Sequence, residues 1–140
     1  MVDYNAMKEI VGGGKSHLII DASPENIYKK CKIPGSINIP PSSVKKENIE
    51  KHIKGKLKYK GKNVLEQPIV VYSKNTDCGE SLKLKKLLIK FGFTNVSEYT
   101  EGVMGWVRQQ GKDSTKCDKQ TGKWYKNKQS PKFINDSDTR

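Results

Sequence analysis

Apolar residues along the chain form two kinds of pattern: short continuous runs, and longer segments in which they recur at helical spacing. The continuous runs predict strands at 17–21, 36–39, 69–72 and 95–99. The periodic segments predict helices at 4–11, 24–30, 42–55, 78–91 and 103–110. The run at 69–72 does not alternate with polar residues, which is typical of a parallel strand covered on both faces. Because strands alternate with helices, we expect an α/β fold with a mainly parallel central sheet and helices on both faces.

Polar residues before the periodic segments predict where two of the helices begin. Ser23, with Pro24 and Glu25 after it, suits a capping hydroxyl followed by a proline and an acid in the first turn. Ser42 or Ser43 is expected to cap the next helix. The apolar face of that helix is assigned to Val44, Ile49, His52 and Ile53. The apolar face of segment 78–91 is assigned to Leu84, Leu87, Leu88, Ile89 and Phe91.

The pattern changes near Lys112, beyond which no sustained period is visible. We therefore predict one α/β domain over residues 1–111 and a basic C-terminal tail over 112–140. Two aromatic pairs in this tail, Trp124-Tyr125 and Phe133-Ile134, are candidates for docking on the domain or on a partner.

The chain carries a formal net charge of +12, a field that favours anionic partners. Of its 27 basic residues only Arg108 and Arg140 are arginine, the residue best suited to bidentate recognition of phosphate and guanine. The lysines are spread along the whole chain. These two facts weigh against nucleic acid as the partner, although a basic nucleic-acid-binding protein remains an alternative.

The three cysteines, Cys31, Cys78 and Cys117, are far apart and odd in number. This pattern favours reduced thiols in a cytoplasmic protein, with Cys31 as a small packed thiol. No apolar run is long enough to span a bilayer, so no membrane partner is expected. His17 and His52 have no Cys or acid at ligand spacing, and neither a metal nor a cofactor is predicted.

The loop after the strand at 69–72 is the main candidate site, because ligands of parallel sheets bind beyond the carboxyl ends of the strands. Ser73 ends the strand, and the loop continues with Lys74, Asn75, Thr76, Asp77, Cys78, Gly79 and Glu80. Asp77 and Glu80 have the spacing of a capping box, which would place Cys78 in the first helical turn. A thiol there is favoured as the anionic thiolate. Ser73 has no nearby histidine to serve as its base and is a poor nucleophile.

Five stretches of the chain, in order over about residues 4–111, resemble the rhodanese-like family of sulfurtransferase domains. They are L-I-I-D-A-S-P-E-N-I-Y (18–28), I-P-G-S-I-N-I-P (33–40), I-V-V-Y-S-K-N-T-D-C-G-E-S (69–81), F-G-F-T-N-V (91–96) and E-G-V-M-G-W-V-R-Q-Q-G (101–111). The resemblance implies a doubly wound, three-layer α/β fold. It also implies an active-site loop that begins at residue 73 and binds sulfane sulfur or a small anion.

The departures from the family bear on activity. The family places a persulfide-forming cysteine directly after this strand, where the chain has Ser73, and an arginine in the opening D-V-R, where it has Ser23. Oxygen cannot take up and pass on a sulfane sulfur. We therefore expect a module that lacks or is impaired in classical thiosulfate sulfurtransferase activity and binds an anion or a protein. The alternatives are an active thiol enzyme that carries persulfide on Cys78, or a serine introduced in place of a natural cysteine.

Overall fold

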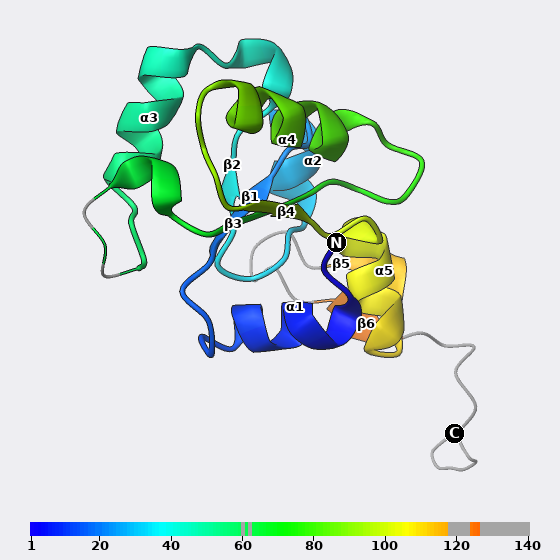
Figure 1. The fold of residues 1–140 in the computed structure, drawn as a ribbon. Coiled ribbons are helices and arrows are strands. Elements are labelled where there is room, and N and C mark those ends of the chain that lie inside the picture. The colour runs from blue at the N-terminus through cyan, green and yellow to red at the C-terminus, as the bar shows by residue number, and fades with distance from the viewer. Residues whose placement is uncertain (60, 62, 118–123, 127–140) are drawn as a thin grey trace.

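The structure of the chain is a computed structural model that describes residues 1–59, 61, 63–117 and 124–126. Its main sheet has four parallel strands in the order β2-β1-β3-β4 (Figure 1). The strands are β1 (Leu18–Asp21), β2 (Ile37–Asn38), β3 (Ile69–Tyr72) and β4 (Val96–Glu98). The predicted α/β fold with a parallel sheet is confirmed.

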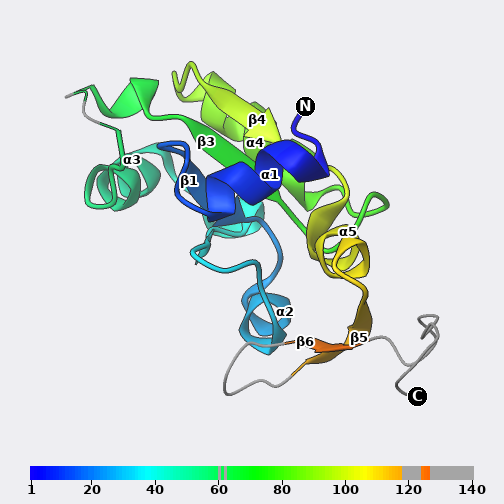
Figure 2. The ribbon, with the colours of Figure 1, turned by 90° about the horizontal axis from the view of Figure 1, so that it is seen from below.

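Helices cover both faces of this sheet. They are α1 (Tyr4–Val11), α2 (Glu25–Lys30), α3 (Lys46–Lys54), α4 (Glu80–Lys90) and α5 (Gly102–Gln109). Figure 1 shows α3 and α4 on one side of the sheet and α1 and α5 on the other. In Figure 2 the sheet is seen from the side of α1 and α5. The two remaining helical segments of the described chain are short 3-10 turns, η1 (Pro41–Ser43) and η2 (Val64–Glu66).

The two central strands, β1 and β3, are buried at every position, as the unbroken apolar run at 69–72 predicts. Their side chains alternate between the two layers. One face packs against α3 and α4 in a core of Leu18, Ile20, Ile49, Ile53, Ile69, Val71, Leu84 and Leu88. The other face packs against α1 and α5 in a core of Met7, Ile10, Ile19, Val70, Tyr72, Val103 and Trp106. Burial on both faces holds β3, and therefore the loop that follows it, in a fixed position.

Two of the predicted helix starts are wrong. The helix α2 has Pro24 as its N-cap residue, without a side-chain capping bond, and Ser23 is buried before it. Ser42 and Ser43 belong to η1, and α3 begins after Lys45. The adjacent prolines at 40 and 41 explain the second difference. Their fixed φ angles favour an extended residue followed by a tight 3-10 turn before the helix can start.

Two residues assigned to apolar helix faces point to solvent instead. His52 is exposed, so the buried stripe of α3 consists of Ile49 and Ile53. Ile89 on α4 is 52% exposed, whereas its neighbour Leu88 is fully buried. One residue along a helix turns the side chain by about 100°, so a residue beside the buried stripe already faces outward.

Part of the segment predicted as a basic C-terminal tail forms strands. The segments β5 (Lys112–Cys117) and β6 (Trp124–Lys126) form a two-stranded antiparallel sheet, which lies beside α5 in Figure 1. Backbone hydrogen bonds hold such a ladder whatever the side chains, which is why this polar segment gave no strand signal. Phe133-Ile134 lies outside the described residues.

The cysteines differ from the expectation of reduced thiols. Cys31 is buried and its sulfur is disulfide-bonded, so it is not a packed thiol. Among the described side chains Cys78 is a free cysteine and is half-buried. No helix in the described part of the chain has both the length and the apolar character needed to cross a bilayer.

Candidate functional site

The carboxyl edge of the main sheet ends in a row of polar residues. Asp21 closes β1 and is paired in register with Asn38 at the end of β2 and with Tyr72 at the end of β3. Glu98 closes β4. Because all four strands are parallel, these side chains and the loop after β3 lie at one edge, where α/β folds bind their ligands.

Ser73, the first residue of the candidate loop, is buried and hydrogen-bonded. Its side chain is 1% exposed, and its Oγ donates to Ser81 Oγ at 3.4 Å. Ser81 Oγ in turn donates to Glu98 Oε2 at 2.7 Å. Each serine hydroxyl carries one proton, so this order leaves Ser81 as the acceptor of the Ser73 proton. Ser73 is therefore the first donor in a series of hydrogen bonds that runs through Ser81 to the carboxylate of Glu98.

The start of the loop is fastened to the N-terminus of α5. The backbone N–H of Val103 donates to the carbonyl of Ser73, and that of Met104 to the carbonyl of Lys74, both at 3.0 Å. These bonds satisfy N–H groups that have no partner inside the helix. Gly102 makes the close approach possible. Its φ is +68°, and a Cβ added there would lie 2.5 Å from the Ser73 carbonyl oxygen.

The middle of the loop is shaped by Asn75. Its Oδ1 accepts the N–H of Asp77 at 3.0 Å, and its backbone carbonyl accepts the N–H of Cys78 at 3.3 Å. These two bonds fold the loop into a turn. Lys74, Thr76, Asp77 and Gly79 are exposed on its outside, and Glu80 is half-buried. The side chains that remain available to a ligand are therefore on the outer surface of the turn, not at Ser73.

The predicted capping box at Asp77 is wrong. The helix α4 begins at Glu80, and its N-cap is Gly79, without a side-chain capping bond. Cys78 therefore precedes the N-cap and lies outside the first helical turn. The turn built by Asn75 occupies the N–H of Asp77 and delays the helix start. Within the described residues, no hydrogen bond joins the Cys78 thiol to Ser73.

Asp21 is a buried carboxyl group beside the loop. Its Oδ1 accepts the N–H of Ser23 at 2.8 Å. Burial raises the pKa of Asp21 above its ordinary value, hydrogen bonds from Ser23 and Tyr72 oppose that rise, and the charge of Glu80 adds to it. The sequence indicates this aspartate only as part of the stretch 18–28, because its burial depends on which strands lie on each side of β1.

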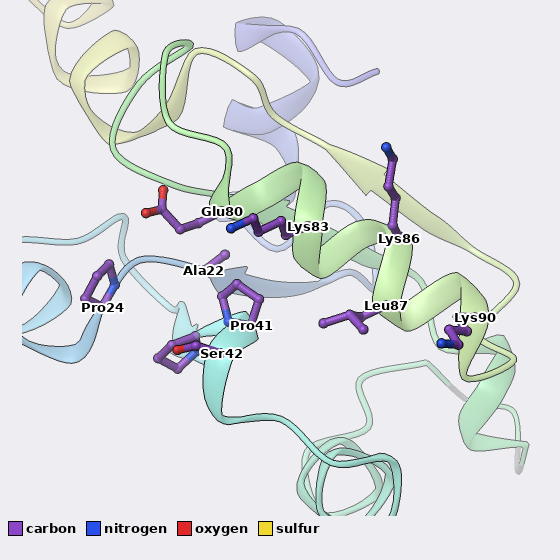
Figure 3. Close-up of a pocket in the computed structure, with 10 residues that line it drawn as sticks. Ala22, Pro24, Pro41, Ser42, Glu80, Lys83, Lys86, Leu87 and Lys90 are labelled. Carbon is purple, nitrogen blue, oxygen red and sulfur yellow. The ribbon is translucent and has the colours of Figure 1, made fainter.

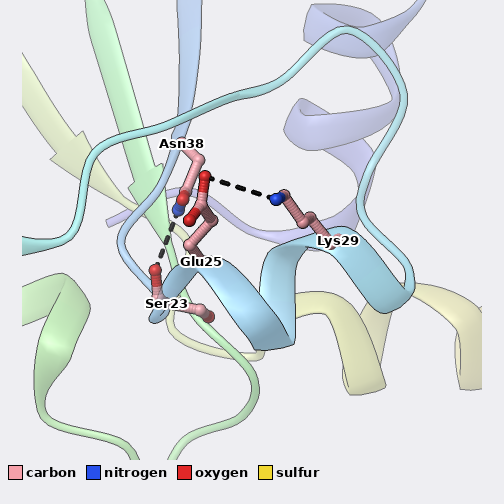
Figure 4. Close-up of polar contacts among 4 residues, drawn as sticks. All are labelled: Ser23, Glu25, Lys29 and Asn38. Atoms are coloured by element: carbon pink, nitrogen blue, oxygen red, sulfur yellow. Dashed lines mark hydrogen bonds and ion pairs between the residues drawn. The ribbon is translucent and has the colours of Figure 1, made fainter.

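The segment that contains Asp21 is held by Asn38 on the neighbouring strand β2. Asn38 Nδ2 donates to the backbone carbonyl of Asp21 at 2.9 Å. It also donates to the backbone carbonyl of Ser23 at 2.8 Å, the bond drawn in Figure 4. In the same view Glu25 and Lys29 form an exposed ion pair of 3.6 Å, which contributes little to stability. The D-A-S segment is thus fixed by the amide of Asn38, and Ser23 is buried where the family resemblance places an arginine.

Tyr72 links the I-P-G turn to the sheet. Its hydroxyl accepts the N–H of Ile33 at 3.0 Å and lies 2.9 Å from Ser36 Oγ, which donates to the carbonyl of Ile33. Burial and the nearby charge of Asp21 hold the pKa of Tyr72 well above its usual range. Tyr72 therefore stays neutral, and its hydroxyl fastens the I-P-G turn to the sheet.

Replacing Asp21 with asparagine is expected to leave the protein equally or more stable at pH 7, by up to about 1 kcal/mol. Because the pKa of Asp21 is raised by folding, the folded state binds its proton more tightly than the unfolded state does. Stability is then lost as the pH rises from the ordinary value of an aspartate through the raised value. The asparagine side chain avoids this cost and keeps an acceptor for Ser23. Urea unfolding at pH 7 and pH 4 measures the difference, which should shrink at the lower pH. A variant clearly less stable at pH 7 would contradict this account.

Glu98 belongs to the candidate site, although the sequence does not predict it there. The structure brings together Ser73, Ser81 and Glu98, with Asp21 nearby, and turns Lys74, Thr76 and Asp77 outward. Glu98 gave no signal because its position depends on β4 pairing with β3, which only the sheet order reveals. The described side chains include no cluster of three or more His, Cys, Asp or Glu that could hold a metal ion.

Known structures with the same fold come from several organisms. The chain matches the human single-domain sulfurtransferase TSTD1 with a TM-score of 0.60 and 18% identity, covering 78% of this chain and 96% of that one. It matches the BH2092 protein of Bacillus halodurans with a TM-score of 0.64 and 22% identity, covering 79% of this chain and 73% of that one. At these identities the likeness shows the three-layer fold alone.

Comparisons of the sequence with relatives and with a family model identify the family as well as the fold. The chain is 36% identical over 91 residues to the uncharacterized protein YibN of Escherichia coli, covering 64% of this chain and 55% of YibN. It is 28% identical over 98 residues to the adenylyltransferase and sulfurtransferase UBA4 of Debaryomyces hansenii, covering 69% of this chain and 20% of UBA4. It thus spans about half or less of these relatives. The model of the rhodanese-like domain matches residues 3–109, and the chain therefore belongs to the rhodanese-like domain family.

Proposed function

We propose that this chain is a rhodanese-like module without classical thiosulfate sulfurtransferase activity, in which Ser73 occupies the place of the sulfur-accepting residue and the loop at 73–80 binds an anion or a protein. The observation that carries the proposal is the hydroxyl chain from Ser73 through Ser81 to Glu98. In classical transfer a thiolate attacks the outer sulfur of thiosulfate, an S–S bond forms, and sulfite leaves. A serine oxygen forms no equivalent persulfide.

The surroundings of Ser73 support this proposal in two further ways. Its side chain is buried, which disfavours the charged alkoxide that would have to attack a donor. Its proton is directed toward Ser81 and the Glu98 carboxylate, a negative charge that disfavours a second anion at position 73. The exposed outer surface of the loop, with Lys74 and Thr76, is then the part that meets a partner.

The second candidate function is a thiol sulfurtransferase that carries persulfide on Cys78. It is favoured by one observation, namely that Cys78 is a free, half-buried cysteine in the candidate loop. Its backbone N–H is already used by the Asn75 carbonyl, so that N–H is not available to a bound thiosulfate or persulfide. A serine at position 73 is compatible with this function only if Cys78 accepts sulfur by itself.

Thiosulfate treatment of the full chain followed by mass spectrometry separates the two candidates. We expect no sulfur on Cys78 and no transfer of sulfur to cyanide above the level of the Cys78→Ala variant, because the family position offers no thiolate. Cys78→Ala is the control for adventitious reaction at other cysteines. Wild-type turnover that disappears in Cys78→Ala, together with one added sulfur atom on the peptide containing Cys78, would overturn the first proposal and establish the second.

A further inference from the structure

A groove lies beside the candidate loop, between α4 and the turn η1 (Figure 3). Its volume is about 520 Å³, within the range of pockets that bind small ligands. Ala22 from the end of β1 and Glu80 from the start of α4 both line it. Since Glu80 closes the loop that contains Cys78, the groove continues directly from the proposed binding loop along α4.

One side of the groove is apolar and rigid. Pro24, Pro40 and Pro41 form it, together with Ala22. Leu87 extends from α4 toward Pro41 across the groove and is half-buried. Prolines have a fixed φ and no N–H group, so this wall offers apolar contact and loses little conformational freedom when a ligand binds.

The other side of the groove is positively charged. Lys83, Lys86 and Lys90 line it from successive turns of α4, and all three are exposed. None of them forms an ion pair with a described side chain, and Glu80 is the single acid among the lining residues. In Figure 3 the ammonium group of Lys86 points away from Pro41 and Leu87. Exposed ammonium groups beside an apolar floor complement a ligand that is both acidic and apolar.

We propose that this groove docks an extended acidic segment of a partner protein, with one apolar side chain on Leu87 and Pro41 and carboxylates paired with the lysines of α4. The inference rests on the proposed function, because it names the class of partner that the same sheet edge would meet. Nucleic acid fits less well, since no lining residue is an arginine or an aromatic side chain on which a base could stack.

Fluorescence anisotropy with a defined probe tests this proposal. The probe is a short fluorescein-labelled peptide in which glutamate and leucine alternate, and companion peptides carry serine in place of leucine or lysine in place of glutamate. The full chain should bind the first peptide saturably and the companions at least about tenfold more weakly. Rising salt should weaken binding, because the lysines are exposed.

Matched variants locate the binding. The triple variant Lys83→Gln/Lys86→Gln/Lys90→Gln should lose about tenfold or more in affinity, whereas Lys46→Gln/Lys51→Gln/Lys54→Gln on α3 removes the same charge and should lose about twofold or less. Leu87→Ser should weaken binding, and Ile89→Ser, an exposed neighbour outside the groove, should not. Circular dichroism checks that each variant is folded.

Several results would overturn the proposal. These are no saturable binding of the acidic peptide, an equal loss in the two triple variants, or tighter binding of a single-stranded oligonucleotide or of phosphatidylserine vesicles through the same lysines. The measurement is independent of sulfur chemistry. Sulfur transfer by the wild-type chain would refute the proposed function but would not change the result of the peptide-binding experiment. If the chain shows neither sulfur transfer nor peptide binding, only the docking proposal is refuted.

Discussion

Replacing Ser73 with cysteine is expected to create measurable thiosulfate-to-cyanide transfer, and adding Glu98→Gln should raise the rate by about tenfold or more. A thiol at position 73 supplies the missing nucleophile, but it lies next to the same Ser81 hydroxyl, which is hydrogen-bonded to Glu98. Ser81 directs its proton to Glu98 and offers only a lone pair to residue 73. That arrangement favours the neutral thiol, and the carboxylate repels the thiolate, so the single variant should be slow at neutral pH.

Glutamine at position 98 removes the charge that repels the thiolate and changes the direction in which Ser81 donates its proton. It carries no charge, and its amide can donate to Ser81 Oγ, which frees the Ser81 proton to point at the sulfur. Both changes stabilise the thiolate, the form that attacks the outer sulfur of thiosulfate. The rate of the double variant should therefore reach its plateau at a lower pH than that of Ser73→Cys.

Two controls make this prediction specific. Glu98→Gln in the Ser73 chain should remain inactive, because it creates no nucleophile. Ser73→Cys/Glu101→Gln removes an acid at the N-cap of α5 that has no bond to Ser81, and it should behave as Ser73→Cys alone. If Ser73→Cys is fully active and gains nothing from Glu98→Gln, the hydroxyl chain does not govern position 73. If the double variant is inactive, the loop is not shaped to hold a donor.

The sequence predicted the central layer of the fold because strong local patterns specify it. The apolar run at 69–72 identified a strand buried on both faces, and the periodic leucines of 78–91 identified the helix that follows. Local patterns failed where a side chain or a proline competes with a standard helix start. Asn75 builds a turn that postpones α4 past Cys78, and Pro40-Pro41 inserts a 3-10 turn before α3.

The candidate site was predicted only in part, for a different reason. Ser73 and its loop follow directly from the end of β3, so sequence order placed them correctly. Glu98 and Gly102 reach Ser73 through the pairing of β4 with β3 and the packing of α5 on the loop. Contacts of that kind depend on which elements lie side by side, and hydrophobic spacing contains no information about them. The groove also required the fold, because its two walls come from segments far apart in the sequence, at Pro41 and Leu87.

Substituting alanine for Gly102 is expected to destabilise the protein by about 3 kcal/mol, well above the cost of an ordinary surface substitution. Two effects add. An alanine at a φ of +68° is strained by about 1 kcal/mol. Its Cβ would also lie 2.5 Å from the carbonyl oxygen of Ser73 and 2.7 Å from that of Lys74. These are backbone atoms, so the loop itself must move away from α5 and weaken the bonds donated by Val103 and Met104.

Gly111 supplies the matched control for this close approach. It also has a positive φ, +72°, but a Cβ there would meet nothing within 4 Å. Gly111→Ala should therefore cost only the strain of about 1 kcal/mol, and urea unfolding of the two variants isolates the contribution of the packed loop. Equal losses in the free energy of unfolding of the two variants would show that the loop backbone moves away from residue 102 at little energetic cost. In the active Ser73→Cys/Glu98→Gln background, Gly102→Ala should also abolish the gained transfer while Gly111→Ala preserves it, since only the first displaces the backbone that carries residue 73.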